Sequence, residues 1–293
     1  MFLFALGLIG ILNGYLPVLG GPDTPARSAA IDSLAALGAD GVAGLGQTLQ
    51  EADWRAQEGI LDALTRIGPV SVAPLAQTAR NHRVEDTRRR AIRALGRVGG
   101  AAARDSLLML LGGGERDIVL EALGTIGDST VVPDILRFLA DPAPDVRRRA
   151  VVALGKMAGT GAVGQMIDAL SDSHHGVRFA AAGGLETMGV PAAKALLSQV
   201  EGIPLPGRYL AIRTLGRLRY APARDFLAHV FVLRGRDWSL RAAAAEALGW
   251  LGTGGGAETL EEALRRERHP FVRERIRFSL GLMDDGMKNG VLE

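Results

Sequence analysis

The apolar residues of this chain follow a pattern that repeats in blocks of roughly 30 residues. The blocks align on a leucine, here called the anchor, as in Leu95-Gly96-Arg97-Val98-Gly99. Apolar residues recur eight and four residues before the anchor, at the anchor and three residues after it, which is the spacing of one face of an α-helix. Each block therefore predicts one amphipathic helix, here called the anchor helix. The anchors are Leu34, Leu64, Leu95, Leu123, Leu154, Leu185, Leu215, Leu248 and Leu280.

A second, shorter helix is predicted between successive anchor helices. Residues 131–140 form one such segment, and the prolines of the turn at 141–144 separate it from the next anchor helix. The residue just before the anchor is small in every block, so we expect neighbouring anchor helices to approach closely. Each block is thus predicted to be a helical hairpin. Glycines four residues after the anchor suit a left-handed helix end, and they are Gly38, Gly68, Gly99, Gly127, Gly189 and Gly252.

An arginine stands seven residues before the anchor in eight of the nine blocks, and Gln57 is the exception. We call these nine positions the ladder. A repeated cation invites a functional interpretation, but one cation in every hairpin also suits a structural bond that sets the register of the helices. The ladder arginines are Arg27, Arg88, Arg116, Arg147, Arg178, Arg208, Arg241 and Arg273.

The string from Asp145 to Gly155, DVRRRAVVALG, resembles the short bacterial HEAT-like repeat first associated with phycobilisome lyases. The resemblance covers nearly the whole chain. It implies an all-α fold, an α-solenoid of about nine to ten helical hairpins in which residues 1–293 form a single domain. In that family the ladder arginine bonds an acidic residue in the turn between helices, so we expect Asp86 and Asp145 to bond Arg88 and Arg147. The family consists mostly of binding scaffolds with a few enzymes, which implies a scaffold here.

Composition narrows the classes of function. The chain is 47% hydrophobic, enough to bury a core, while 5% aromatic residues and 39 glycines argue against a β-sandwich or barrel. The net charge of +2 provides no overall field that would attract DNA or an anionic membrane. The absence of cysteine excludes disulfides, thiolate catalysis and cysteine-ligated metals.

No motif in the sequence supports catalysis. Residues 159–164, GTGAVG, match the dinucleotide fingerprint, but a predicted helix precedes them where that motif needs a strand. None of the five histidines has another four residues away on the same helical face. Deoxyhypusine hydroxylase, an iron enzyme of HEAT architecture, depends on His-Glu dipeptides, and no histidine here precedes a glutamate. We therefore expect a protein that is not an enzyme and that uses no cofactor and no metal.

The apolar N-terminal segment, residues 1–22, contains no charged side chain. Residues 1–12 resemble the core of a signal peptide or a membrane anchor, yet they lack a basic start, and Leu6 stands where a further anchor would fall. We favour a degenerate repeat that packs on the block of Leu34, in a cytoplasmic protein. The alternative is a protein exported or membrane-anchored through this segment.

The leading functional hypothesis is a protein–protein interaction scaffold. Positions six and two residues before the anchor and two after it form one column per anchor helix, away from the packed face; in the resembling family this face lines the concave side of the superhelix. Its charge changes sign between neighbouring helices, because Asp117 and Glu121 follow a helix with three arginines. The candidate partner-binding residues are Arg89, Arg93, Arg97, Arg148, Lys156, Phe179, Tyr209, Arg213, Arg217, Trp250 and Phe278.

Three alternatives stay open. The column can be a merely solvated face. The protein can be a nucleic-acid-binding HEAT-like protein, although an acidic helix between basic ones suits a phosphate backbone poorly. It can also be a subunit similar to the phycobilin lyases, which act as chaperones for a chromophore. No residue in the sequence indicates that chemistry directly.

Overall fold

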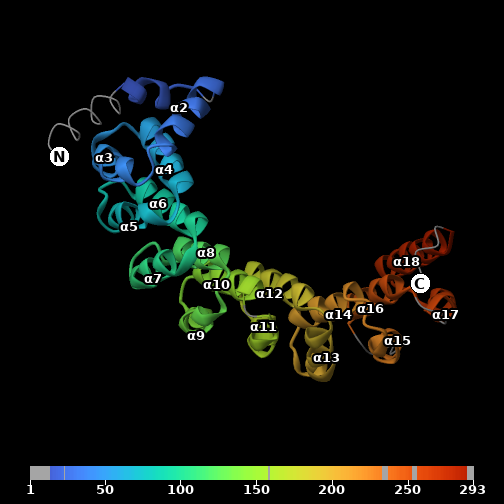
Figure 1. Ribbon diagram of the computed structural model, residues 1–293. Helices are drawn as coiled ribbons and strands as arrows, with labels where there is room; N and C mark the ends of the chain where they lie inside the picture. The colour runs from blue at the N-terminus through green and yellow to red at the C-terminus, as the bar shows by residue number, and fades with distance from the viewer. Residues whose placement is uncertain (1–13, 23, 158, 233–236, 253–255, 289–293) are drawn as a thin grey trace. The chain divides into compact units, whose positions relative to one another are not determined.

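The computed structural model describes residues 14–22, 24–157, 159–232, 237–252 and 256–288 (Figure 1), without the side chains of 160, 232 and 284–288. Within these ranges the secondary structure is helical and contains no strand. The chain divides into two compact units, unit 1 at Met1–Phe138 and unit 2 at Leu139–Glu293. That residues 1–293 form a single domain stays a prediction.

Every anchor leucine lies in a helix of its own, as the sequence pattern predicts. Within each unit, successive anchor helices pack side by side. The anchor helices are α2 (Pro25–Ala35), α4 (Trp54–Ile67), α6 (Glu85–Val98), α8 (Arg116–Ile126), α10 (Pro144–Met157), α12 (His175–Met188), α14 (Gly207–Arg217), α16 (Trp238–Leu251) and α18 (Pro270–Lys288).

The shorter helices form a second row, which lies along one side of the anchor helices in each unit (Figure 1). Within each unit the shorter helices pack against the anchor helix that follows them, as α5 does against α6 and α15 against α16, so the repeated element is a helical hairpin and the predicted α-solenoid fold is confirmed. The shorter helices are α3 (Gly38–Glu51), α5 (Val72–Asn81), α7 (Gly100–Leu110), α9 (Val132–Leu136), α11 (Val163–Ala169), α13 (Val190–Gln199), α15 (Arg224–Val232) and α17 (Gly256–Arg266).

The anchors form the centre of the core. Eight of them are at most 2% exposed, and Leu280 in α18 is half-buried. Close approach between two neighbouring anchor helices depends on two positions. One is the glycine directly after the anchor of the first helix, and the other is the small residue directly before the anchor of the next helix. A Cβ atom placed on Gly216 would lie 2.4 Å from the Cα atom of Ala247, and one on Gly96 would lie 2.9 Å from that of Ala122. The predicted close packing is therefore confirmed, and only glycine permits it.

The six predicted helix-ending glycines all have a positive φ, from 55° at Gly38 to 87° at Gly68. L-residues with a side chain rarely adopt this conformation, and five of these glycines stand directly after the last residue of their helix and end it. Gly38 differs, because α2 already ends at Ala35 and Gly38 is the first residue of α3.

The ladder is structural, but its acidic partners are not the predicted ones. Asp86 pairs with Arg90 and Asp145 with Arg148, their neighbours four and three residues along the same helix. Residues two apart point to different sides of a helix, so neither acid can reach its ladder arginine. The acid instead comes from the turn of the next hairpin: Arg147 Nε donates to Asp172 at 2.7 Å, and Arg241 Nε donates to Glu267 at 2.8 Å.

Several ladder arginines also hold the turn before their own helix. Arg147 Nη1 donates to the carbonyl of Asp141, Arg178 Nη1 to that of Asp172, and Arg273 Nη1 to that of Glu267, each six residues earlier. A single guanidinium thus joins the turn of its own hairpin to the carboxylate of the following one, and Arg147 holds the pKa of the Asp172 carboxyl below its usual range.

Gln57 makes the same two connections without charge. Its Nε2 donates to the carbonyl of Ala52 at 2.9 Å, while its Oε1 accepts from the hydroxyl of Thr87 at 2.7 Å. Its amide also lies 3.4 Å from Nε2 of His82, which stands six residues before Arg88, the place that Asp172 takes before Arg178. A neutral amide therefore faces a histidine at this link, whereas Arg147 and Arg241 face an acid.

Residues 1–12, predicted to form a degenerate repeat, lie outside the described residues. Residues 14–19 are helical, and Leu19 is buried on α4, where a Cβ atom at Gly59 would lie 2.7 Å from it. Among the described residues, no helix combines the length and the apolar character that crossing a membrane requires. Cytoplasmic location stays a prediction.

Candidate functional site

The described residues hold no group of three metal-ligating side chains, and the fingerprint-like segment has no strand before it. Gly159–Ala162 forms a short 3-10 turn between α10 and α11. His82 is buried in the neutral link described above, and His269 stacks on Trp238 with ring centres 4.7 Å apart. The candidate site is therefore the column on the anchor helices.

In unit 1 the three predicted arginines of α6 lie on its solvent side, and each faces a carboxylate of a neighbouring helix. Arg89 lies 2.9 Å from Asp117 of α8, which raises the pKa of the guanidinium. Arg93 lies 3.9 Å from Glu121 of α8, and Arg97 lies 3.3 Å from Asp62 of α4. The opposite charges that alternate along the sequence thus form ion pairs with one another inside the chain.

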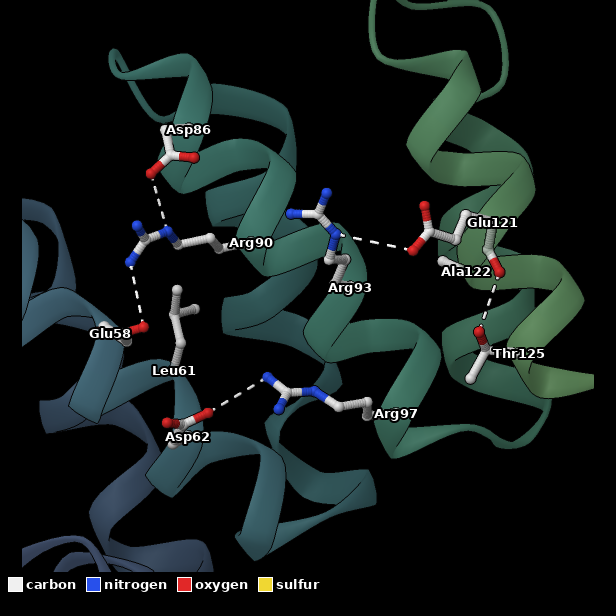
Figure 2. A pocket seen from close by; sticks show the side chains of 10 residues that line it. All are labelled: Glu58, Leu61, Asp62, Asp86, Arg90, Arg93, Arg97, Glu121, Ala122 and Thr125. Atoms are coloured by element: carbon white, nitrogen blue, oxygen red, sulfur yellow. Dashed lines mark hydrogen bonds and ion pairs between the residues drawn. The ribbon is translucent and has the colours of Figure 1, made fainter. Parts of the chain in front are cut away.

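Arg93 and Arg97 line a groove of about 620 Å³ over α4, α6 and α8 (Figure 2). Arg90, which sequence analysis did not select, reaches into the same groove and lies 3.6 Å from Glu58. Such half-exposed ion pairs contribute roughly 0 to 1 kcal/mol each. The groove is polar and its charges are matched from within, so a partner of mixed charge can exchange these pairs for its own. Its lining is Glu58, Leu61, Asp62, Asp86, Arg90, Arg93, Arg97, Glu121, Ala122 and Thr125.

In unit 2 the column is uncharged on α12 and carries Arg148 and Lys156 on α10. Phe179 on α12 is 59% exposed, and Gly183 below it has open space where a side chain would stand. On α10, Arg148 pairs with Asp145 of its own helix at 3.6 Å, whereas Lys156 is exposed. The exposed ring of Phe179 and the space at Gly183 on α12 therefore lie on the helix next to the one that carries the exposed Lys156.

Arginines and aromatic rings alternate over α14, α16 and α18. The guanidinium of Arg213 lies 5.5 Å from the ring centre of Tyr209 and 5.3 Å from that of Trp250. Arg217 lies 5.4 Å from Trp250 on the same side of α14. These distances are within the range of cation–π attraction. The guanidinium groups of Arg213 and Arg217 thus lie close to the rings of Tyr209 and Trp250.

The buried carboxylate of Glu246 is the centre of this cluster. It lies 2.8 Å from Arg213 of α14 and 3.3 Å from Arg275 of α18, and its side chain is 8% exposed. Arg275 in turn lies between Phe271 and Phe278, 5.2 and 5.5 Å from their ring centres. We call Tyr209, Arg213, Arg217, Glu246, Trp250, Phe271, Arg275 and Phe278 the arginine–aromatic cluster.

The prediction that the whole column is exposed is wrong on α16. Ala242 and Glu246 are 2% and 6% exposed, and Glu246 is paired with Arg213 of α14 and Arg275 of α18. Sequence analysis also missed Phe271 and Arg275. Arg275 and Arg90 both stand five residues before their anchors, one place beside the column, and that shared position is the signal that could have found them.

Comparison with solved structures finds helical relatives at low sequence identity. Human deoxyhypusine hydroxylase in complex with glycerol is 22% identical over 84% of this chain and 97% of its own, with a TM-score of 0.41. The Escherichia coli protein YibA is 15% identical over 90% and 98%, with a TM-score of 0.49. The complex of CpcE and CpcF of phycocyanin lyase from Nostoc sp. PCC7120 is 20% identical over 82% and 93%, with a TM-score of 0.41. No curated protein sequence matches the chain significantly.

The family model for HEAT repeats matches residues 42–123, 115–165, 132–201 and 206–281. These segments include eight of the nine anchor helices in whole or in large part, and their hairpins are the repeats that the sequence pattern defines. The chain belongs to the HEAT-repeat family.

Proposed function

We propose that the protein is a non-catalytic scaffold that binds a protein partner along the column of its anchor helices. One observation carries the proposal: aromatic rings and arginines share an open surface on unit 2, where Phe179 and Phe278 are 59% and 50% exposed. Covering one such ring contributes roughly 1.5 to 3 kcal/mol. Arginine, tyrosine and tryptophan are also the residues that most often dominate binding energy at protein interfaces.

The charge pattern supports a protein partner over a nucleic acid. Arg89 and Arg93 of unit 1 already face Asp117 and Glu121, so a phosphate backbone would have to displace a carboxylate at each contact. A protein surface of mixed charge can replace both members of such a pair. In unit 2 arginines beside aromatic rings offer hydrogen-bond donors, which suit carboxylates and carbonyls.

An affinity pull-down from the native organism, read by mass spectrometry, tests the proposal. Two variants of the full chain are compared with the wild type: Arg89, Arg93 and Arg97 all changed to Ala, and Tyr209 and Trp250 both changed to Ala. We expect the second variant to lose the partner, and the first to weaken its capture where the partner also extends over unit 1. Circular dichroism and thermal unfolding confirm that each variant is folded.

Two results would contradict the proposal. Unchanged capture by both folded variants would remove the column from the binding surface. Tight duplex DNA or RNA binding by the wild type, falling steeply as salt rises, would favour the nucleic-acid alternative instead.

A further inference from the structure

The ladder link between α12 and α14 lacks an acid at the position where two other links have one. Arg147 donates from Nε and Nη2 to the two carboxylate oxygens of Asp172, at 2.7 and 2.9 Å. Arg241 donates in the same way to Glu267, at 2.8 and 3.2 Å. Both acids stand 13 residues before the next anchor, and at that position before the anchor of α14 the chain has Gly202. This position therefore offers no side chain to the arginine of α12.

Arg178, the ladder arginine of α12, has one edge without a partner. Its Nη1 donates to the carbonyls of Asp172 and Ser173, at 2.8 and 2.9 Å, so the guanidinium is held at the turn before its own helix. Its Nε is buried and has no hydrogen-bond acceptor among the described residues, and none of these residues accepts from its Nη2. Nε and Nη2 form the edge with which Arg147 binds Asp172. Buried polar groups nearly always have a hydrogen-bond partner, so an acceptor is expected at this edge.

The turn before α14 lies beside the turn that Arg178 holds. A Cβ atom on Gly207, the first residue of α14, would lie 2.1 Å from the carbonyl oxygen of Leu170, in the segment that leads into that turn. Helix α12 packs against α14, as α10 packs against α12. Gly202 thus stands in the turn next to Arg178, in the order that the repeat gives to the other links.

The space at Gly202 is open. A Cβ atom there would meet no described atom within 4 Å, and the residue is exposed. Gly202 also borders a groove of about 390 Å³ over α11 and α13. The lining of this groove contains one carboxylate, Asp168, and no cation. An anion near Gly202 therefore has its charge partner in Arg178 and not in the groove.

The carboxylates of the chain near this turn do not bind the edge. Both oxygens of Asp172 are already bound by Arg147. Neither Glu201, in the same turn as the glycine, nor Asp168 forms an ion pair with Arg178 in the described part of the chain. A carboxylate at this edge has to come from elsewhere.

We propose that the edge formed by Nε and Nη2 of Arg178 is a second binding site, apart from the column, and that it takes a carboxylate from another molecule. The carboxylate lies over Gly202 and accepts two parallel hydrogen bonds, as Asp172 does from Arg147. It thereby closes the link between α12 and α14. Two sources share this chemistry: an aspartate or glutamate side chain of the protein partner, and a small free carboxylic acid.

Nuclear magnetic resonance of the full chain, labelled with the heavy nitrogen isotope, tests this inference with acetate as the probe. The Nε–H resonance of Arg178 is identified by its absence from the spectrum of Arg178→Lys. The wild type is titrated with sodium acetate in exchange for sodium chloride, so that the ionic strength stays constant. We expect a saturable shift of this resonance. The resonances of Arg147 and Arg241 should stay in place, because their edges already bind carboxylates.

Gly202→Asp supplies the carboxylate from within the chain. The φ of Gly202 is not positive and its surroundings are open, so an aspartate fits there. We expect this variant to shift the Arg178 resonance without acetate, to lose the response to acetate and to unfold at a higher temperature than the wild type. Gly161→Asp is the matched control: Gly161 is an exposed glycine with open space in the turn between α10 and α11. It adds the same charge and should keep the wild-type response.

The pull-down distinguishes the two sources. Weaker capture of the partner by Gly202→Asp than by Gly161→Asp assigns the carboxylate to the partner. Equal capture by the two variants, together with the acetate response, assigns it to a small free acid.

Three results would overturn the inference. The Arg178 resonance does not respond to acetate, as expected where water alone satisfies the edge; the resonances of Arg147 and Arg241 respond equally; or Gly202→Asp keeps the response. None of these results involves the column, so the scaffold function stands or fails separately, on the variants of Tyr209 and Trp250.

Discussion

At the scale of single residues, the ladder shows that a neutral side chain can make the same connections between hairpins as a charged one. Gln57 holds its own turn through the carbonyl of Ala52 and reaches the next hairpin through Thr87, as Arg147 does through Asp141 and Asp172. At both links the groups that face each other across two hairpins match. Arg147 faces the acid Asp172, whereas the amide of Gln57 faces the neutral side chains of Thr87 and His82.

Gln57→Arg should therefore destabilise the protein by about 1 to 3 kcal/mol, because a buried cation would face His82 without an acid. Adding His82→Asp to it should restore most of that loss. Denaturant unfolding of both single variants and the double variant gives the coupling energy. If the two losses simply add, the link is not a matched pair.

The acidic partner of Arg147 makes stability depend on pH. The pKa of Asp172 is below its ordinary 3.8 because Arg147 donates to it, so this contribution is complete above about pH 5 and is lost as the pH falls below 3.8. Asp128, whose pKa the hydroxyl of Thr130 and the guanidinium of Arg104 lower to about 2, adds a loss between about pH 4 and 2. The stability difference between wild type and Asp172→Asn should shrink over this range in urea titrations. A difference that persists undiminished at pH 2 would contradict the assignment.

The ladder also shows how far single residues could be predicted. Its structural role follows from its spacing alone. The acids two residues before Arg88 and Arg147 were the wrong partners, because helical geometry turns them away. The right partner of Arg147, Asp172, stands 25 residues later, a distance that only the packing of two hairpins bridges.

At the scale of helices, a glycine and a small residue set the spacing between neighbours. Gly216 meets the backbone of Ala247, while Gly183, also inside an anchor helix, meets nothing within 4 Å. The sequence predicted this contact from small residues before the anchors. It could not predict that Ala242 and Glu246 are buried, because Glu246 is paired with Arg213 of α14 and Arg275 of α18 and no periodicity records where such long side chains extend.

Gly216→Ala and Gly183→Ala should consequently have opposite effects. The first forces α14 from α16 and should cost about 1 to 3 kcal/mol, the usual penalty of overpacking. The second removes the entropic cost of glycine from a helix and should stabilise by about 0.5 to 1 kcal/mol. Thermal unfolding measures both, and destabilisation of similar size in the two variants would disprove the close contact.

Leu154→Ala tests the anchor itself. Leu154 is fully buried in α10, and truncating it should leave a cavity that costs about 2 to 5 kcal/mol. Chemical denaturation gives the value. A loss below about 1 kcal/mol would show that the site collapses or is solvated.

At the scale of the whole molecule, each hairpin contacts mainly its neighbours in the chain. Stability in such an array is a sum of hairpin terms and interface terms. A substitution in one hairpin should therefore destabilise that hairpin and its neighbours and leave distant hairpins unaffected. In a globular core, by contrast, most residues share neighbours and the effect spreads.

Hydrogen exchange can show this directly. Gly216→Ala should speed amide exchange in α14 and α16 while α4 and α6 keep their wild-type protection, because several interfaces separate them along the chain. Mass spectrometry of peptic fragments reads both regions in one experiment. Equal acceleration throughout the chain would mean that the array unfolds as one cooperative block.

The matched links limit how such a chain can evolve by duplication. A hairpin that brings its own arginine can be copied next to a hairpin whose turn offers an acid, as the turns with Asp172 and Glu267 do for Arg147 and Arg241. The hairpin of Leu64 cannot move alone: copied elsewhere, Gln57 would leave an acid unpaired, and an arginine hairpin inserted in its place would set a cation against His82. Gln57, His82 and Thr87 must therefore be inherited together, whereas a charged link such as that of Arg147 with Asp172 can accept another arginine hairpin.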